Sequence, residues 1–282
     1  MKKLGFTASN KLVTISVVTN KKRGVSMVFD VDVHILILLI SFGFLAAFID
    51  SVVGGGGLIS LPALLFVGLN PAAAVATNKL AGAMGSLTSS ISFYRSGQLE
   101  IRSVLKYFPL AFIGSLCGAW TVHLINPALL KPLMLIMLAA VGIYTIFKKD
   151  WGAVSTVKNL SKTHLFLFMM LLFAIGFYDG FLGPGTGSFL IFSFLLVGFD
   201  FLKAAGNAKF LNLASNVAGV CMFAYLGQIH YVYGLVMGVA QIGGAMLGSR
   251  MAIQKGSGFV RTLFIIVTMT LLAKNAYDYM IH

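Results

Sequence analysis

Residues 50–57 of this chain of 282 residues read DSVVGGGG, and residues 179–187 read DGFLGPGTG. The separation between the two aspartates, Asp50 and Asp179, is shorter by a single position than that between Lys79 and Lys209, the lysines that follow them. The larger separation is then kept as far as Gly118 and Gly248, so a single insertion or deletion beside the glycines explains the change. A register kept over so long a segment indicates that the chain is an internal duplication.

The composition is that of a membrane protein. Hydrophobic residues make up 58% of the chain and charged residues only 10%, whereas about a quarter of the residues are charged in soluble proteins. Helices that cross a bilayer need about 20 mainly apolar residues, and the segments here are too long for the strands of a barrel. The predicted spans lie near residues 34–53, 71–94, 104–125, 128–147, 164–182, 201–225, 231–254 and 258–281.

Two shorter apolar pieces, residues 58–68 and 188–198, directly follow the glycine motifs. A helix of this length covers about 16 Å, too little to cross a hydrocarbon core of about 30 Å, so we interpret both as re-entrant half-helices. The predicted fold is an all-α polytopic membrane protein with about eight transmembrane helices (4+4). Its predicted parts are a basic polar tail (1–30), a first repeat (31–148), a cytoplasmic linker (149–163) and a second repeat (164–282).

The net charge of +13 indicates topology rather than nucleic-acid binding, because the basic residues are scattered over loops without interleaved aromatic residues. Basic residues are frequent in the tail, the linker and the loop after the second span, and cytoplasmic loops are rich in such residues. Four spans per half place all three regions in the cytoplasm and make the two halves run in the same direction. Arg250, Lys255 and Arg261 count against this topology. The tail is expected to be disordered or to reflect a misassigned start, with Met27 as the alternative first residue.

Four charged residues lie inside predicted spans, at matching positions of the two halves. Asp50 and Asp179 precede the glycines, and Lys79 and Lys209 lie in the second span of each half. A charged residue within a span costs at least about 2.5–3.5 kcal/mol, so such residues are functional candidates. The aspartates suit coupling to protons, or alternatively they cap the following turn or half-helix. The lysines suit attraction of an anion into a central cavity, or alternatively they extend to the membrane surface.

Neutral hydrogen-bonding groups and glycines accompany these charges. Free amides at the start of the half-helices would attract an anion, although close packing of small residues is the alternative explanation for the glycines. The small residues of the third span in each half, such as Gly114 and Gly244, favour close packing against neighbouring spans. The predicted anion-binding asparagines are Asn78, Asn207, Asn212 and Asn216, and the break glycines are Gly54, Gly55, Gly56, Gly57, Gly183, Gly185 and Gly187.

The sequence predicts no cofactor and no metal. Cys117 and Cys221 lack metal-ligand spacing and suit small packing residues. The second glycine motif lacks the lysine of a nucleotide-binding loop. An intramembrane enzyme is disfavoured, because no Gly-x-Ser-x-Gly elbow is present and His123 and His230 lie near span ends.

Four short motifs carry a resemblance to a known family. They are FID at 48–50, ATNKL at 76–80, GFYDGF at 176–181 and NAK at 207–209. In these motifs and their order, residues 35–280 resemble the TauE/SafE family, the sulfite exporter or TSUP group of bacterial inner-membrane permeases. The resemblance implies an internally duplicated secondary transporter of about eight helices in the cytoplasmic membrane, with sulfite, sulfonates or related sulfur-containing anions as substrates.

Together these observations predict a secondary transporter of a small anion. Lys79 and Lys209 would neutralise the substrate, the asparagines and half-helix amides would orient it, and Asp50 and Asp179 would couple its movement to protons. The expected partners are the anion, protons and the lipid bilayer, and the sequence leaves open whether the chain forms a homo-oligomer. A passive anion channel and a membrane scaffold without transport remain as alternatives.

Overall fold

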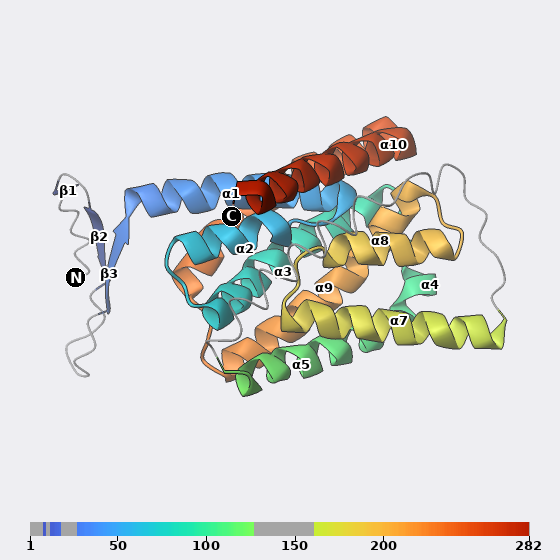
Figure 1. Ribbon diagram of the computed structural model, residues 1–282, viewed down its shortest axis with the longest axis horizontal. Helices are drawn as coiled ribbons and strands as arrows, with labels where there is room; N and C mark the ends of the chain where they lie inside the picture. Colours follow the sequence, from blue (N-terminus) through green and yellow to red (C-terminus); the bar gives the residue numbers. More distant parts are fainter. Residues whose placement is uncertain (1–7, 10–11, 18–26, 127–160, 282) are drawn as a thin grey trace.

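In the computed structural model, residues 8–9, 12–17, 27–126 and 161–281 are described (Figure 1). Three short strands precede the helices: β1 (Ala8–Ser9), β2 (Leu12–Val17) and β3 (Met27–Asp32). They form an antiparallel sheet in the order β1-β2-β3, in which Val13 pairs with Val31. The tail predicted from the sequence contains β1 and β2, and the β-branched side chains of β2 suit a strand.

From Val33 onward, the described elements are helices. The first half contains α1 (Val33–Val53), α2 (Gly57–Phe66), α3 (Pro71–Arg95), α4 (Ile101–Val104), the 3-10 helix η1 (Leu105–Tyr107) and α5 (Phe108–Leu124). The second half contains α7 (Lys162–Phe181), α8 (Thr186–Leu196), α9 (Phe201–Tyr225) and α10 (Tyr231–Ile281), which is kinked at Gly256. The predicted span 128–147 and the predicted linker as far as residue 160 lie outside the described residues.

Corresponding helices begin in the same way in both halves. The side chain of Asn70 accepts a hydrogen bond from the Ala73 amide at the start of α3. The side chain of Asp200, at the corresponding position of the second half, does the same for Leu202 and Lys203 at the start of α9. Such caps satisfy amides that have no partner within the helix, so local sequence alone accounts for where these helices begin.

Within the described residues, four helices are long and apolar enough to cross a membrane: α1, the segment Ile101–Leu124, α7 and Tyr231–Gly256 of α10. Helices α3 and α9 are 25 residues long each but are more polar. They lie against each other in the interior of the bundle, which explains how they tolerate polar side chains. The multi-pass membrane architecture that the sequence predicts is therefore confirmed at this level.

The corresponding helices of the two halves run in opposite directions. Lys79 of α3 lies beside Gly219 of α9, and Phe93 of α3 lies beside Gly206, so α3 and α9 are antiparallel. Contacts of the same kind show that α1, α3 and α10 run one way and that α5, α7 and α9 run the other way. The prediction that both halves share one direction is wrong.

The physical reason lies in the helical hairpins at the glycine motifs. Figure 1 shows α2 folded back along α1, and α8 folded back along α7. Each hairpin returns the chain to the end at which it entered, so counting α1 and α7 as ordinary crossings leads to the wrong direction. As a result, α1 and α7 begin at opposite ends of the bundle.

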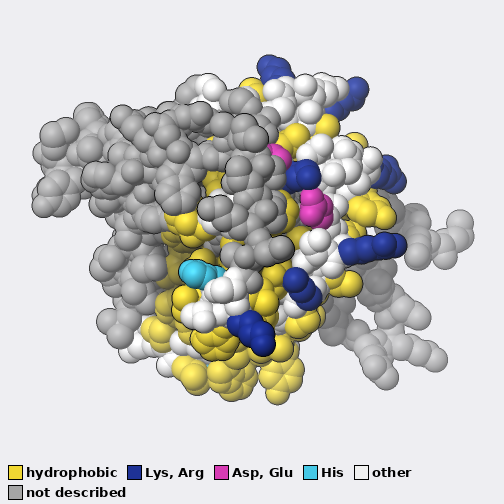
Figure 2. All heavy atoms as spheres, turned by 90° about the vertical axis from the view of Figure 1, so that its right-hand side faces the viewer, with side chains coloured by type: hydrophobic (Ala, Val, Ile, Leu, Met, Phe, Trp, Pro, Cys, Tyr) yellow, Lys and Arg dark blue, Asp and Glu magenta, His cyan; other side chains and the backbone are white. Residues whose placement is uncertain are grey.

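Basic side chains collect at one end of the bundle, which we call the basic end. It is formed by the end of α3 and the starts of α5, α7 and α9, and Figure 2 views it directly. Within residues 33–126 and 161–256, every lysine and arginine apart from the buried Lys79 and Lys209 lies there. These residues are Arg95, Arg102, Lys106, Lys162, Lys203, Arg250 and Lys255; the side chain of Arg261 is outside the described part of the chain.

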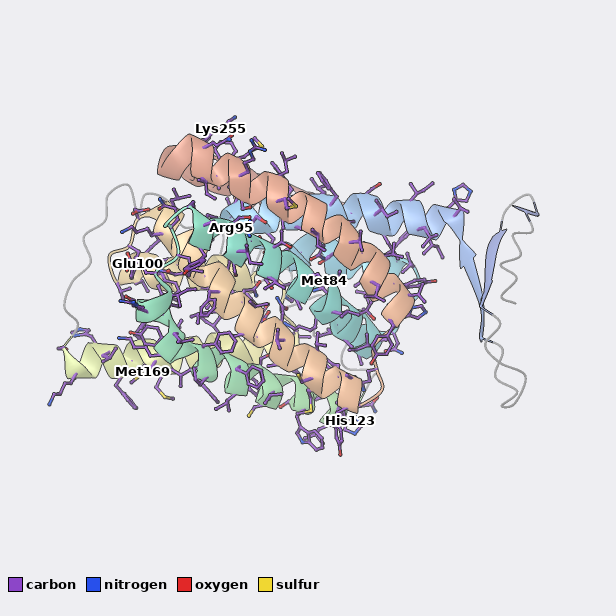
Figure 3. All side chains as sticks on the ribbon, turned by 180° about the vertical axis from the view of Figure 1, so that it is seen from behind. Met84, Arg95, Glu100, His123, Met169 and Lys255 are labelled. Carbon is purple, nitrogen blue, oxygen red and sulfur yellow. The ribbon has the colours of Figure 1, made fainter. Side chains whose placement is uncertain are left out.

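Small residues allow α5 to pack closely against α7, and α10 to pack closely against α1. A Cβ added to Gly114 or Gly118 of α5 would overlap the backbone of α7. A Cβ added to Gly244 or Gly248 of α10 would overlap the backbone of α1 in the same way. The predicted packing role of these glycines is confirmed, and such contacts are typical of membrane helices. Figure 3 shows from behind how α10 and α1 lie side by side. The predicted packing role of Cys117 and Cys221 is wrong, because both side chains are exposed.

Candidate functional site

The two glycine breaks meet in the middle of the bundle. Gly54 (φ 77°) and Gly183 (φ 87°) adopt left-handed conformations that favour glycine. A Cβ on Gly54 would overlap the backbone of Gly187 and Ser188, so only glycine permits this approach. The Ser188 hydroxyl donates a hydrogen bond to the Val53 carbonyl at 3.1 Å and joins the two breaks. The starts of α2 and α8 are thereby brought together.

An ion pair between Lys79 and Asp179 connects the two halves beside the breaks. The Lys79 Nζ lies 2.8 Å from the Asp179 Oδ2, and both side chains are almost fully buried, with exposed fractions of 2% and 3%. The Ser215 hydroxyl of α9 donates a hydrogen bond to the same carboxylate oxygen. Lys79 therefore does not extend to the membrane surface, which removes that alternative.

A second ion pair joins Lys209 to Asp50. The Lys209 Nζ lies 2.6 Å from the Asp50 Oδ2; the lysine side chain is 0% exposed and the aspartate side chain is 24% exposed. The other carboxylate oxygen of Asp50 accepts a hydrogen bond from the Gly56 amide at 3.0 Å. Asp50 thus both caps the break, as one alternative predicted, and pairs with a lysine of the other half.

The two pairs are crossed. Asp50, which precedes the glycines of the first half, binds Lys209 on α9 of the second half. Asp179, which precedes the glycines of the second half, binds Lys79 on α3 of the first half. Sequence reasoning identified all four residues but not how they pair, because pairing depends on how the halves pack. The glycines also make room for the lysines: a Cβ on Gly183 would lie 3.2 Å from the Lys79 Nζ, and one on Gly187 would lie 3.2 Å from the Lys209 Nζ.

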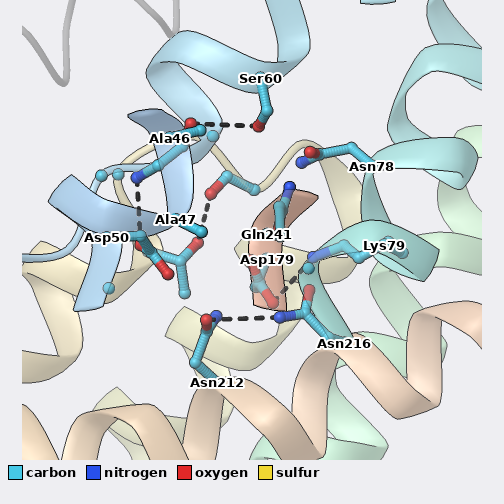
Figure 4. Close-up of a pocket in the computed structure, with 18 residues that line it drawn as sticks. Ala46, Ala47, Asp50, Ser60, Asn78, Lys79, Asp179, Asn212, Asn216 and Gln241 are labelled. Atoms are coloured by element: carbon cyan, nitrogen blue, oxygen red, sulfur yellow. Dashed lines mark hydrogen bonds and ion pairs between the residues drawn. The ribbon is translucent and has the colours of Figure 1, made fainter. Parts of the chain in front are cut away.

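A pocket of about 40 Å³ lies next to these groups (Figure 4). Since a water molecule needs about 10–15 Å³ by this measure, the pocket has room for about three waters or for a small ion. Both helix breaks contribute to its wall, together with Asp50, Lys79, Asp179, Asn78, Asn212 and Asn216 of the predicted site. The remaining lining residues are Ala46, Ala47, Gly55, Gly56, Gly57, Ser60, Gly82, Gly183, Gly185, Thr186, Gly187 and Gln241.

Two of the predicted anion-binding residues lie elsewhere, and so does the break glycine Gly54. Lys209 is not part of the pocket wall, although its ammonium group contacts Asp50 and lies near Gly187, which both line the pocket. Asn207 accepts a hydrogen bond from the Glu100 amide at 3.1 Å near the basic end, and its Nδ2 has no partner within the described residues. Within the pocket, the Asn216 Nδ2 lies 3.3 Å from the Asn212 Oδ1.

The sequence analysis missed Ser60 and Gln241 as pocket residues. Gln241 lies on α10, far in sequence from both glycine motifs, and no spacing pattern connects it to them. The only available signal was that an amide interrupts an otherwise apolar span, which is weak on its own.

The charges at the site nearly cancel. Two lysines and two aspartates sum to zero when all are ionised, and the starts of α2 and α8 each contribute up to about half a positive charge. The two helix starts therefore leave the site with a small excess of positive charge. Among the described residues, no group of three or more histidine, cysteine or acidic side chains is arranged to hold a metal ion.

Comparisons with known proteins point to one family. The family model for the sulfite exporter TauE/SafE matches residues 39–275. The chain is 37% identical over 250 residues to a "Probable membrane transporter protein" of Haemophilus influenzae, covering 88% of this chain and 97% of that protein. It is 38% identical over 251 residues to "Probable membrane transporter protein ORF9" of Sinorhizobium sp, covering 88% and 95%.

A third relative is "Probable membrane transporter protein YfcA" of Escherichia coli K12, which is 36% identical over 251 residues, covering 89% of this chain and 93% of the relative. No solved structure matches the chain.

Proposed function

The chain belongs to the sulfite exporter TauE/SafE family of membrane transporters, and on this premise we propose that it is a secondary transporter that carries a small anion through the central pocket. The observation that carries this proposal is the meeting of both helix breaks, the Lys79–Asp179 ion pair and Asp50 at one cavity. Binding sites of secondary transporters are formed by broken helices at the interface of repeats.

The pocket suits an oxyanion the size of sulfite or the head group of a sulfonate. Its volume of about 40 Å³ leaves little room for more than a few non-hydrogen atoms. Lys79 would attract the negative charge, and the amides of Asn78 and Asn212 would bind its oxygens. A sulfonate with a longer organic part would need the pocket to widen toward one end.

We also propose that the two halves are inverted repeats. In support, the Glu100 amide donates a hydrogen bond to the Asn207 side chain at the basic end, and the His230 amide donates one to the Thr77 side chain at the opposite end. Glu100 and His230 occupy corresponding positions of the two halves, and so do Thr77 and Asn207. In this proposal α2 and α8 are the re-entrant half-helices of the two repeats, and the break glycines form their starts.

These two contacts, which we call the end latches, suit alternating access. One connects the loop before α4 to α9, and the other connects the loop before α10 to α3. In the proposed transport cycle, each would close one end of the path to the pocket. Opening one end latch while the other stays closed would expose the pocket to one side at a time. The partly exposed Lys203–Glu100 ion pair, with an Nζ to Oε1 distance of 3.0 Å, reinforces only the end latch at the basic end.

The basic end would face the cytoplasm of a bacterial inner membrane, in keeping with the positive-inside rule. Arg250 and Lys255, which fit poorly with halves that share one direction, then lie on the same side as Arg95, Arg102 and Lys162. Because α1 begins at the opposite end, the N-terminus would face away from the cytoplasm. This orientation reverses the one predicted from sequence.

Proton coupling would act through the aspartates. Protonation of Asp179 weakens its hold on Lys79 and frees the ammonium group for an anion, whereas loss of that proton restores the ion pair and releases the anion. Protonation of Asp50 would likewise weaken its ion pair with Lys209. A passive channel would lack this coupling and would not saturate.

The test is flux of radiolabelled sulfite into proteoliposomes, with and without an imposed pH gradient. We expect saturable uptake that rises with the gradient and disappears in the double variant Lys79→Ala with Lys209→Ala. The matched control is Lys106→Ala, which removes an exposed lysine at the basic end. Full uptake by a folded double variant would contradict the site, and uptake without saturation would favour the channel.

A further inference from the structure

Resting on the proposed function, we infer that Gln241 is a specificity-determining residue that binds an oxygen atom of the transported anion. Gln241 is on α10, and its side chain is only 5% exposed. It lines the same pocket as Lys79 and Asn78, and Figure 4 shows it projecting between Ala47 and Asn78. The first observation in its favour is therefore its position.

The second observation is that this buried amide lacks a partner. Asn212 and Asn216, the neighbouring pocket amides, contact each other, and Asn216 also contacts Ser86. Gln241 makes no hydrogen bond to any described residue, although a buried side-chain amide ordinarily has several. Asn78 also lacks a protein partner among these residues, but it is less buried. An occupant of the pocket is what would satisfy the Gln241 amide.

The third observation is that the opposite helix leaves space for this side chain. A Cβ added to Gly85 of α3 would lie 2.9 Å from the Gln241 Oε1, so even alanine at residue 85 would push the amide away. The residue that corresponds to Gly85 in the second half is Ser215, and the residue that corresponds to Gln241 in the first half is Ala111. The Gln241 amide thus occurs together with the glycine that leaves space for it, and neither occurs at the corresponding positions, Ala111 and Ser215.

The chemistry of an amide complements that of Lys79. The lysine attracts any small anion, because it acts as a point charge. A glutamine amide adds a directed hydrogen bond without adding charge, so it favours anions with a second oxygen pointing away from the lysine. The structure therefore assigns to Gln241 the discrimination of sulfur oxyanions such as sulfite from spherical anions such as chloride.

The test compares Gln241→Ala, Gln241→Glu and the control Gln254→Ala in proteoliposomes, with labelled sulfite as the probe and chloride as the competitor. Gln254 is an exposed glutamine on the same helix. Loss of a hydrogen bond to a charged ligand should raise the KM of Gln241→Ala about tenfold to a hundredfold, with the maximal rate nearly unchanged. Chloride should then compete more effectively, and Gln241→Glu should abolish uptake because its carboxylate repels the anion.

A second variant tests the position without touching the amide. Gly85→Ala should raise the KM for sulfite in the same direction as Gln241→Ala, and a monodisperse gel-filtration profile should show that it folds. An unchanged KM and unchanged chloride competition in Gln241→Ala would overturn the inference while leaving the proposed function intact. Absence of saturable sulfite uptake by the unmodified protein would overturn the proposed function and this inference with it.

Discussion

The Lys79–Asp179 and Lys209–Asp50 pairs have the same chemistry and occupy corresponding positions, yet their surroundings differ. Lys79 lies on the wall of the pocket, beside Asn78 and near Gln241. The residue that corresponds to Asn78 in the second half is Ala208, which is fully buried in an apolar cluster, and Lys209 does not line the pocket. The two halves therefore carry two equivalent lysines, of which only Lys79 lies on the wall of the pocket.

Stability offers the first way to test this comparison, and the largest effect is expected there. Asp179→Ala and Asp50→Ala each leave a buried ammonium group without its partner, which should lower the free energy of unfolding by about 3–5 kcal/mol. The double variant Asp179→Ala with Lys79→Ala should recover most of the loss, because no charge remains unpaired. Unfolding of the detergent-solubilised protein measures both effects. Wild-type stability in either single variant would contradict the buried pairing.

Transport should separate the two lysines. Lys79→Gln removes the charge that faces the pocket, so the KM for sulfite should rise about tenfold to a hundredfold. Lys209→Gln removes a charge that pairs with Asp50 but does not line the pocket. It should therefore leave the KM within about threefold of the wild-type value and lower mainly the maximal rate. Initial rates of uptake over a range of sulfite concentrations provide both constants. Equal changes of KM in the two variants would mean that both lysines bind the substrate from the same cavity.

The smallest effect on the KM is expected when the surroundings of Lys79 are made to resemble those of Lys209. Asn78→Ala places at this position the residue that the second half carries in Ala208, and it removes one neutral hydrogen-bonding group from the pocket. Loss of one such hydrogen bond should raise the KM about twofold to tenfold. The reciprocal variant Ala208→Asn serves as the control and should not lower the KM, since residue 208 does not line the pocket. A lower KM in that control would show that the surroundings of Lys209 also bind the anion.

Much of the candidate site was predictable because similar motifs recur in the two halves of the sequence. Asp50, Asp179, Lys79 and Lys209 stood out as costly charges in apolar segments, and a repeated charge is stronger evidence than a single one. Asn207 was included because it lies near Lys209 in the sequence, but its side chain accepts a hydrogen bond from the Glu100 amide near the basic end instead. Gln241 was missed because nothing near it in the chain indicates that α10 crosses the pocket.

The sequence by itself determined the helices, their caps at Asn70 and Asp200, the glycine breaks and the packing role of residues such as Gly114 and Gly244. Each of these depends on interactions within a few residues or on the cost of placing a group in lipid. Only the tertiary structure decided the directions of the two halves, the crossing of the ion pairs and the membership of the pocket. Those features depend on contacts between residues far apart in the chain, such as Asp50 and Lys209, and many packings of the same helices satisfy the local rules equally well.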